Sequence, residues 1–360
     1  MKLIAIIGTR PELIKMSPVV KALKLKSDIF QTKILFTGQH EESLKKNAPL
    51  MGIAPDISLS VIRQNQSLGL LTAKLLSKID KVIHKERPDW IIAQGDTSSV
   101  FVSSLLAFYH KIKFAHVEAG LRTKNKFSPF PEEFNRFVCG YIADINFAPT
   151  KFAVNNLISE NIPIEKILLT GNTGIDSLLD AAKWTDHSQI KIPEGKKIIL
   201  MTTHRRENFK VIQNIFKAIQ QIAQNHQDIH IFYPLHINPV IQKKARELLS
   251  DIDNIELLPP QDYTNFVHLI KKSDLILTDS GGIQEEAPTF GIPVLIMREE
   301  TERPEGIKAG VAKLVGTNKD EIINAFNKIY KGKFQKHSIT NPYGDGKASE
   351  RIIKFFESQI

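Results

Sequence analysis

Three carboxylates in the first half of the chain stand where proton transfer chemistry is expected. Asp96 ends the apolar run W-I-I-A-Q-G-D, and Glu118 follows F-A-H-V. Glu132 opens a predicted helix after the irregular run K-F-S-P-F-P. For each one alone, a helix cap or a solvated acid is the commoner explanation. Two of the three lie at the ends of predicted strands, and the convergence of all three favours acid and base work instead.

The segment T-D-S-G-G-I-Q-E-E, residues 278–286, predicts an anion site at a helix start. Free N–H groups there attract negative charge, and Gly281 and Gly282 leave those groups unobstructed. The Ser280 hydroxyl adds a donor, and Glu286, about one turn further on, can accept hydrogen bonds from ribose hydroxyls. An ordinary N-cap is the alternative explanation.

Cationic side chains follow other predicted strands. Arg10 lies in G-T-R-P-E after the first strand and can form a bidentate contact with phosphate, and Lys15 lies about a turn and a half beyond it. His204, in T-T-H-R-R-E-N-F, can donate to a leaving diphosphate, with Arg205 beside it. His236, in Y-P-L-H-I-N-P, is a second histidine at a predicted strand end, and it is a weaker candidate for a functional role than His204. A surface arginine and structural histidines are the alternatives.

The elements that must position these residues are short apolar runs that alternate with amphipathic stretches throughout. Such runs predict parallel strands buried on both faces. We therefore predict an α/β fold with two doubly wound Rossmann-like domains that face a central cleft. The first covers residues 1–172 and the second residues 173–345, with the seam near Gly171 to Pro193. Residues 346–360 are expected to form a helix that packs back on the first domain.

Composition excludes several other classes of protein. The net charge of +9 comes from scattered lysines, which do not form a nucleic-acid groove. No apolar run approaches the ~20 residues that span a bilayer, and no signal peptide is visible, so no membrane partner is expected. A single cysteine, Cys139, fits the cytoplasm. Neither a metal motif nor G-x-G-x-x-G is present, so neither a metal nor another cofactor is expected.

Many motifs, in order, make the chain resemble the non-hydrolysing UDP-N-acetylglucosamine 2-epimerases, which share the architecture of the B-type glycosyltransferases. They include G-T-R-P-E-L-I-K-M-S-P, Q-G-D-T, H-V-E-A-G-L-R-T, P-F-P-E-E-F-N-R, H-R-R-E-N, T-D-S-G-G-I-Q-E-E-A-P and N-P-Y-G-D-G-K-A. The resemblance implies reversible epimerisation at C2 through elimination of UDP to 2-acetamidoglucal and re-addition. It also implies a UDP-sugar ligand, a homodimer and a role in polysaccharide synthesis.

The resemblance also implies roles for individual residues. Asp96, Glu118 and Glu132 match the acid and base carboxylates, and His204 matches the histidine that faces the diphosphate. The residues matching the substrate site are Arg10, Lys15, Gln261, Phe266, Ser280, Gly281, Gly282, Glu286 and Arg303.

Many bacterial members bind a second UDP-N-acetylglucosamine as an activator, and the match to that site is incomplete. The residues that match it are Gln39, His40, Arg205 and His236. Glu42 stands where a second glutamine is usual, Asn65 where those members have an arginine, and Lys210 where a glycine is common. These departures argue against activation.

Four rival interpretations stay open at this point. They are a glycosyltransferase of the same fold, a hydrolysing epimerase, a 2-epimerase of a related UDP-diacetamido sugar, and a nucleotide-sugar sensor without catalysis. A sensor or a transferase does not require three clustered carboxylates. The division of work between base and acid among these carboxylates also stays open.

Overall fold

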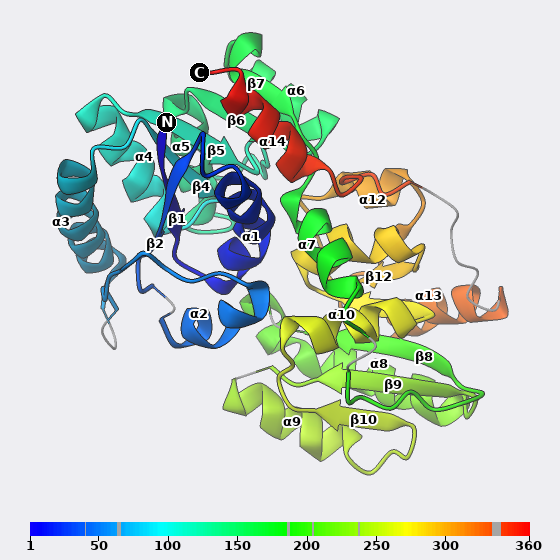
Figure 1. Ribbon diagram of the computed structural model, residues 1–360. Coiled ribbons are helices and arrows are strands. Elements are labelled where there is room, and N and C mark those ends of the chain that lie inside the picture. Colours follow the sequence, from blue (N-terminus) through cyan, green and yellow to red (C-terminus); the bar gives the residue numbers. More distant parts are fainter. Residues whose placement is uncertain (40, 63–65, 186–187, 204, 237, 333–339) are drawn as a thin grey trace. The chain divides into compact units, whose positions relative to one another are not determined.

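The computed structural model describes residues 1–39, 41–62, 66–185, 188–203, 205–236, 238–332 and 340–360 (Figure 1). The chain forms two compact units: unit 1 contains Met1–Ser177 and Gly344–Ile360, and unit 2 contains Leu178–Tyr343. Each unit has one parallel sheet with helices between successive strands. The predicted α/β fold with two doubly wound, Rossmann-like domains is therefore confirmed.

The described residues of unit 1 form a seven-stranded sheet with the order β3-β2-β1-β4-β5-β6-β7. Its strands are β1 (Lys2–Ile7), β2 (Gln31–Phe36), β3 (Ile57–Ser58), β4 (Trp90–Gln94), β5 (Lys113–Val117), β6 (Ile145–Ala148) and β7 (Ile167–Leu169). The neighbours β4 and β5 are parallel, with Gln94 opposite Val117. Their carboxyl ends therefore lie side by side, which is where polar side chains of a site are expected.

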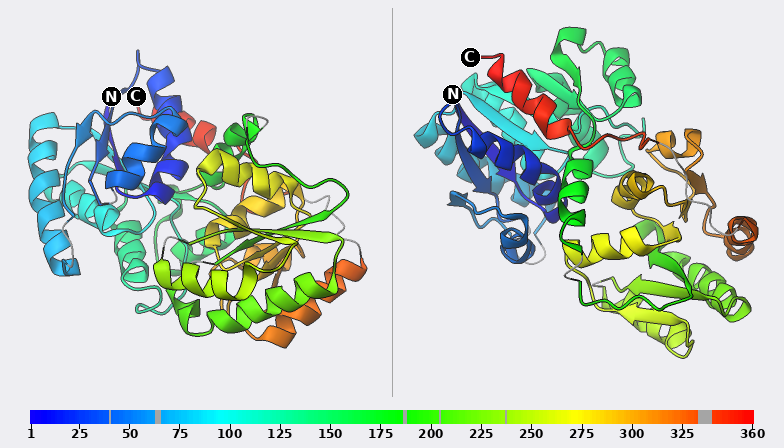
Figure 2. Two further views of the ribbon diagram at one scale, coloured as in Figure 1. Left: turned by 90° about the horizontal axis from the view of Figure 1, so that it is seen from below. Right: turned by 45° about the vertical axis from the view of Figure 1, so that its right-hand side comes forward.

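Helices cover both faces of this sheet (Figures 1 and 2). The helices of this unit are α1 (Arg10–Leu25), α2 (Glu41–Asn47), α3 (Leu68–Glu86), α4 (Ser98–His110), α5 (Glu132–Ile142), α6 (Lys151–Ser159), the start of α7 (Thr173–Ala182) and α14 (Ala348–Glu357). Short 3-10 turns are η1 (Pro49–Met51) and η2 (Ile164–Lys166). The strands are buried on both faces because helices flank them, so they read as unbroken apolar runs.

Helix α14 packs on unit 1, beside α1 (Figure 2). The Phe356 ring meets the Trp90 ring edge to face, with centroids 5.4 Å apart. The Asp176 carboxylate accepts hydrogen bonds from the backbone N–H of Ser349 at 2.8 Å and from its hydroxyl at 2.6 Å. Asp176 thus satisfies part of the free helix start, and the two phenylalanines at positions 355 and 356 bury the other end.

Unit 2 contains, among its described residues, a six-stranded sheet with the order β10-β9-β8-β11-β12-β13. The strands are β8 (Lys197–Thr202), β9 (Ile229–Pro234), β10 (Ile255–Leu258), β11 (Leu275–Thr278), β12 (Val294–Ile296) and β13 (Ala312–Leu314). The helices are α8 (Ile212–Asn225), α9 (Pro239–Leu249), α10 (Tyr263–Lys272), α11 (Gly281–Glu286), α12 (Pro304–Lys308) and α13 (Lys319–Lys331). The 3-10 helices among its described residues include η4 (Arg206–Lys210) and η5 (Ala287–Phe290).

Alternate residues of β8 face opposite sides of this second sheet. Ile199 and Met201 pack in a core with α8, α9 and α13, whereas Ile198 and Leu200 pack in a second core with α10 and η5. Both sets are almost completely buried. This strand therefore has no polar alternation, because both of its faces are covered.

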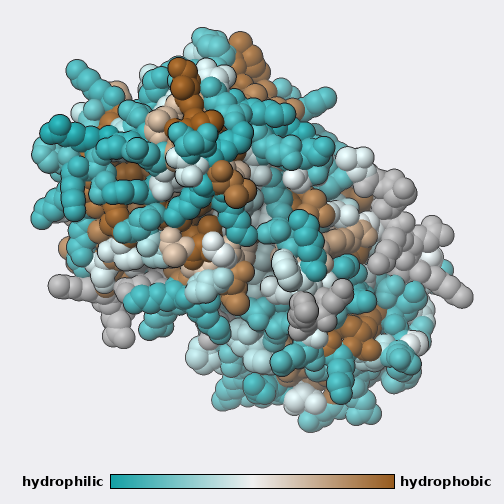
Figure 3. All heavy atoms as spheres, in the orientation of Figure 1, coloured by the Kyte–Doolittle hydropathy of each residue, from teal (hydrophilic) through white to brown (hydrophobic). Residues whose placement is uncertain are grey.

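The surface in the view of Figure 3 is mostly hydrophilic. Among the residues that the structure describes, every helix is too short or too polar to cross a lipid bilayer.

Candidate active site

Glu118 lies directly after β5 in a left-handed backbone conformation, with φ of +63°. Such a conformation costs a non-glycine residue about 1 kcal/mol or more, so its surroundings must hold it. The Lys15 ammonium group forms an ion pair with Oε1, and the Gln94 amide donates to Oε2. The side chain is 9% exposed. The Glu118 carboxyl group is thus held at the edge of the sheet by contacts that include one cation and one amide.

Asp96 lies after the neighbouring strand, β4, and follows Gly95, whose φ is +86°. The Arg136 guanidinium donates to Asp96 Oδ2 from Nη2 at 2.6 Å and from Nε at 3.1 Å. The Asn135 side chain donates to the Asp96 carbonyl at 2.8 Å. A Cβ atom placed on Gly95 would lie 3.9 Å from the nearer oxygen of Glu118. The structure therefore brings the surroundings of Asp96 and Glu118 together.

His116 supports this edge of the sheet from within. Its Nε2 lies 2.7 Å from the carbonyl oxygen of Gly95, to which it donates, and the side chain is fully buried. Burial lowers the pKa of His116 to about 4, although the hydrogen bond to Gly95 acts in the opposite direction. His116 is therefore a neutral donor that fixes the peptide immediately before Asp96.

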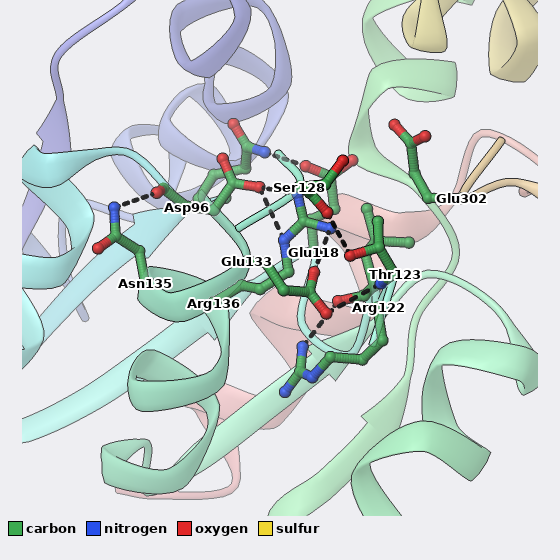
Figure 4. A network of polar contacts seen from close by, with 12 residues as sticks. Asp96, Glu118, Arg122, Thr123, Ser128, Glu133, Asn135, Arg136 and Glu302 are labelled. Atoms are coloured by element: carbon green, nitrogen blue, oxygen red, sulfur yellow. Dashed lines mark hydrogen bonds and ion pairs between the residues drawn. The ribbon is translucent and has the colours of Figure 1, made fainter. Parts of the chain in front are cut away.

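Glu132 is the first residue of α5, as predicted, and the same helix turn carries Asn135 and Arg136. Figure 4 shows that Asp96, Asn135 and Arg136 form one polar network with Glu133. Glu132 therefore lies on the helix that holds Asp96.

Arg10 and Lys15 both lie on α1, which begins at Arg10. The Glu12 carboxylate accepts hydrogen bonds from the backbone N–H groups of Gly8 and Thr9, and Thr9 caps the helix in return. Burial raises the pKa of Glu12 to about 7, against the effect of these hydrogen bonds. Glu12 thus fixes the turn from which Arg10 projects.

In unit 2, Ser280 is the N-cap of α11, and Gly281 and Gly282 are its first two residues. A Cβ atom on Gly281 would lie 2.7 Å from the Arg303 guanidinium, so only glycine permits this close approach. Arg303 is held by Glu285, with Nε and Oε1 2.6 Å apart. A guanidinium and free helix N–H groups therefore converge at one point, and this arrangement suits an anion.

Glu302 gathers three guanidinium groups close to this point. Its carboxylate is 2.9 Å from Arg298 and 3.3 Å from Arg205, and it also pairs with Arg303. Burial acts to raise the pKa of Glu302, but the positive charges of Arg303, Arg298 and Arg205 lower it well below its usual range. Arg205, predicted as an allosteric residue, therefore shares a carboxylate with Arg303, a predicted substrate residue.

The predicted uracil and ribose residues lie on neighbouring parts of unit 2. Gln261 precedes α10 and donates to the Pro259 carbonyl at 2.6 Å, whereas Phe266 lies within α10 and packs on the apolar core. Glu286 ends α11 and accepts a hydrogen bond from the Tyr263 hydroxyl at 3.0 Å. Tyr263 thus links the two segments.

Two of the predicted residues, His204 and His40, lie outside the described residues. Gln39 accepts a hydrogen bond from the Ser99 hydroxyl at 2.9 Å. His236 follows β9. Its Nδ1 accepts a hydrogen bond from the Asn238 N–H at 3.0 Å, and burial lowers its pKa.

Within the described part of the chain, no cluster of three or more His, Cys, Asp or Glu side chains is arranged to hold a metal ion.

Several residues that shape the site were not singled out from the sequence. They are Glu12, Gln94, His116, Glu133, Asn135, Arg136 and Glu302. The motif P-F-P-E-E-F-N-R contains three of them, so polar residues in the first turn of one predicted helix were an available signal. Their partners were not visible, because each contact joins distant parts of the chain.

The chain is similar to several known proteins along nearly its whole length. A model of the family UDP-N-acetylglucosamine 2-epimerase matches residues 21–357. A UDP-N-acetylglucosamine 2-epimerase of Neisseria meningitidis serogroup A is 42% identical over 367 residues, which cover 98% of each protein. One from Bacillus subtilis is 42% identical over 98% of this chain and 94% of its own length.

Solved structures agree with these relatives. The crystal structure of UDP-GlcNAc 2-epimerase from Neisseria meningitidis bound to UDP-GlcNAc has a TM-score of 0.94 at 42% identity, and the match covers 99% of this chain and 100% of that one. The enzyme from Methanocaldococcus jannaschii, in complex with UDP-GlcNAc and UDP, has a TM-score of 0.83 at 35% identity, with 99% and 100% covered.

Proposed function

Because the chain belongs to the UDP-N-acetylglucosamine 2-epimerase family and is therefore an isomerase, we propose that it interconverts UDP-N-acetylglucosamine and UDP-N-acetylmannosamine. The observation that carries this proposal is the pair of carboxylates at the ends of neighbouring strands. Glu118 is paired with Lys15 and Asp96 with Arg136. Each carboxylate is thus held in a defined position at the sheet edge.

The proposed reaction balances without an oxidant or reductant. A carboxylate removes the C2 proton, and the C2–H electron pair forms the C1–C2 double bond. The C1–O bond breaks at the same time, in an anti elimination that gives UDP and 2-acetamidoglucal. A different group, acting as an acid, then gives a proton to the other face of C2. The UDP oxygen re-forms the bond to C1 in this step, which is a syn addition. The enzyme must therefore supply groups that exchange protons and donors that stabilise the departing diphosphate.

Residues of unit 1 supply the proton chemistry in this proposal. Asp96, Glu118 and Glu132 act on the sugar, and Lys15 orients Glu118 through their ion pair. Arg10 projects from the turn that Glu12 fixes, and its positive charge binds the substrate in this proposal. The support is that Asp96 and Glu118 lie at adjacent strand ends and that Glu132 begins the helix that holds Asp96.

Residues of unit 2 hold UDP in this proposal. The N-terminus of α11 and Arg303 bind the diphosphate, Glu286 binds the ribose, and the segment from Gln261 to Phe266 holds the uracil. The convergence of the Arg303 guanidinium with Gly281 supports the first assignment. His204, which lies outside the described residues, is assigned to the diphosphate from its motif alone.

We also propose that the product supplies precursors for a surface polysaccharide, in the cytoplasm, and that the enzyme is a homodimer. The aromatic residues Phe134, Phe137 and Tyr141 are exposed along one side of α5, and α4, which contacts α5, carries the exposed Phe108 and Tyr109. Such an exposed apolar group favours cover by a second copy of the chain. Light scattering should give the dimer mass, and Tyr141→Asp should give the monomer. A monomeric wild-type protein at micromolar concentration would refute the dimer.

Incubation with UDP-N-acetylglucosamine in D₂O tests the proposed activity. Both recovered nucleotide sugars should carry deuterium at C2, because the proton that returns comes from a group in exchange with solvent. Release of free N-acetylmannosamine would indicate the hydrolysing reaction instead. Unlabelled substrate without the manno product, from folded protein, would refute epimerisation of this sugar.

A matched pair of variants tests the assignment of Asp96. Asp96→Asn should lower kcat by about a thousandfold or more, because one carboxylate that exchanges protons is lost. Asp28→Asn removes an exposed carboxylate from the same unit and should leave kcat unchanged. Equal activity of the two variants would remove Asp96 from the mechanism.

A further inference from the structure

Asp96 is held by a relay of buried polar side chains that all project from the first turn of α5 (Figure 4). Glu133, Asn135 and Arg136 are 5%, 4% and 6% exposed, respectively. Polar groups buried to this extent are costly unless they are paired. The contacts that these three side chains make therefore indicate their role in the protein.

The first step of the relay fixes Glu133 to the backbone. Its Oε1 accepts the N–H groups of Thr123 and Lys124, both at 2.9 Å. These two residues belong to the segment that follows β5 and Glu118. Lys124 has a φ of +64°, a conformation that the hydrogen bond to Glu133 helps to hold. The other carboxylate oxygen, Oε2, lies 3.2 Å from Arg136 Nη1.

In the second step, Arg136 and Asn135 fix the position of Asp96. Arg136 forms an ion pair with Glu133 through Nη1, without a hydrogen bond between them, and donates hydrogen bonds from both Nη2 and Nε to a single oxygen of Asp96, Oδ2. A planar guanidinium held between two carboxylates has little rotational freedom. Asn135 fixes the Asp96 carbonyl, so both the main chain and the side chain of Asp96 are tied to α5.

The two Asp96 oxygens consequently have different surroundings. Oδ2 accepts both guanidinium hydrogen bonds, whereas Oδ1 accepts none from the described residues. The Asp96 side chain is 26% exposed, compared with 8% for that of Arg136. Arg136 therefore lies behind the carboxylate, and Asp96 keeps an accessible side.

We propose that Arg136 is a positioning residue that anchors Asp96 through Oδ2 and so assigns proton exchange with the sugar to Oδ1, and that Glu133 in turn positions Arg136. This inference rests on the proposed epimerase reaction, which it deepens. Because Glu132 precedes Glu133 on α5, the same helix turn sets the position of a second carboxylate that acts on the sugar. Arg136 itself does not touch the substrate in this proposal.

The test compares Arg136→Gln, Arg136→Lys and the double variant Glu133→Gln/Arg136→Gln with the wild type. Arg136→Gln should lower kcat by about a hundredfold, because a carboxylate displaced by about 1 Å reacts far less often. Arg136→Lys should recover about tenfold of that loss, since an ammonium group replaces part of the contact. The KM and the affinity for UDP should stay within about threefold of the wild type.

The double variant covers the case in which Arg136→Gln folds poorly. Arg136→Gln leaves Glu133 as a buried charge without its counter-ion, whereas the double variant removes both charges. It should regain wild-type thermal stability but not kcat. This combination separates positioning of Asp96 from a contribution to folding.

The kinetic isotope effect gives a readout that a purely structural role would not change. With substrate deuterated at C2, the isotope effect on kcat should rise in Arg136→Gln, because proton removal becomes the slow step. Three results would each overturn the inference: a kcat within about threefold of the wild type, a parallel loss of kcat and UDP affinity, or no advantage of Arg136→Lys over Arg136→Gln. If the wild type does not exchange the C2 proton, the proposed function fails instead. If the wild type exchanges it and Asp96→Asn is inactive, these variants test the relay alone.

Discussion

The buried Glu12 should make the stability of unit 1 depend on pH, and the substitution Glu12→Gln should remove this dependence. Glu12 is 2% exposed, and burial raises the pKa of its carboxyl group from 4.5 to about 7. The folded state therefore binds a proton more tightly than the unfolded state does. The contribution of this group to stability is fully present below pH 4.5 and is lost as the pH rises to about 7.

The magnitude follows from the size of the shift. Each unit of pKa difference corresponds to about 1.4 kcal/mol, so the full effect is about 3 kcal/mol, of which about 2.5 kcal/mol falls between pH 5 and pH 8. Glu12→Gln cannot ionise, and its amide oxygen can still accept the N–H groups of Gly8 and Thr9. Relative to the variant, the wild type should therefore lose about 2.5 kcal/mol of unfolding free energy between pH 5 and pH 8.

Urea unfolding followed by tryptophan fluorescence can measure this for unit 1 alone. The chain has two tryptophans, Trp90, which is buried in unit 1, and Trp184, which is 60% exposed in unit 2. Trp184→Phe leaves Trp90 as the only reporter. Wild type and Glu12→Gln are compared in that background at pH 5 and pH 8, and Glu165→Gln serves as the control at an exposed position.

Comparison of the two proteins also cancels the effects of other groups. His116 acts in the opposite direction, because burial lowers its pKa from 6.5 to about 4, so its contribution is lost as the pH falls through that range. It is present in both proteins and drops out of the difference. If the difference between Glu12→Gln and wild type is the same at pH 5 and pH 8 to within about 0.5 kcal/mol, the reasoning about Glu12 is refuted.

Three further outcomes follow from the structure. Gly281→Ala should weaken UDP binding in calorimetry by about tenfold, because its methyl group would displace the Arg303 guanidinium; undiminished affinity would contradict that contact. Asp176→Ala should lower the unfolding free energy of unit 1 by about 1–2 kcal/mol and speed amide hydrogen exchange in α14, whereas unchanged exchange would exclude a capping role. Cys139, which is fully buried with its pKa raised to about 12, should react with iodoacetamide only after urea unfolding; rapid labelling of native protein would show that it is accessible.

Local patterns in the sequence were sufficient to predict the fold class. Strands buried on both faces need unbroken apolar runs, and such runs are visible without any knowledge of their neighbours. The start of α5 at Glu132 and a helix start within residues 278–286 were predicted for the same reason, since helix ends depend on a few adjacent residues. The motifs around Asp96 and Glu118 could be placed at strand ends by the same reasoning. The residues that contact Asp96 and Glu118 could not be predicted in this way.

The partners depend on contacts between distant residues, which only the tertiary structure decided. Arg136 meets Asp96 across forty positions, and Arg205 meets Glu302 across ninety-seven. The sequence identified Glu12 only as part of a turn, because the loss of water that raises its pKa comes from the packing of α1 against the sheet. The sequence by itself therefore determined the elements and the types of residue at their ends. Tertiary packing decided which charges are buried, which are paired and which carboxylate oxygen stays accessible, because these properties depend on what surrounds each group in space.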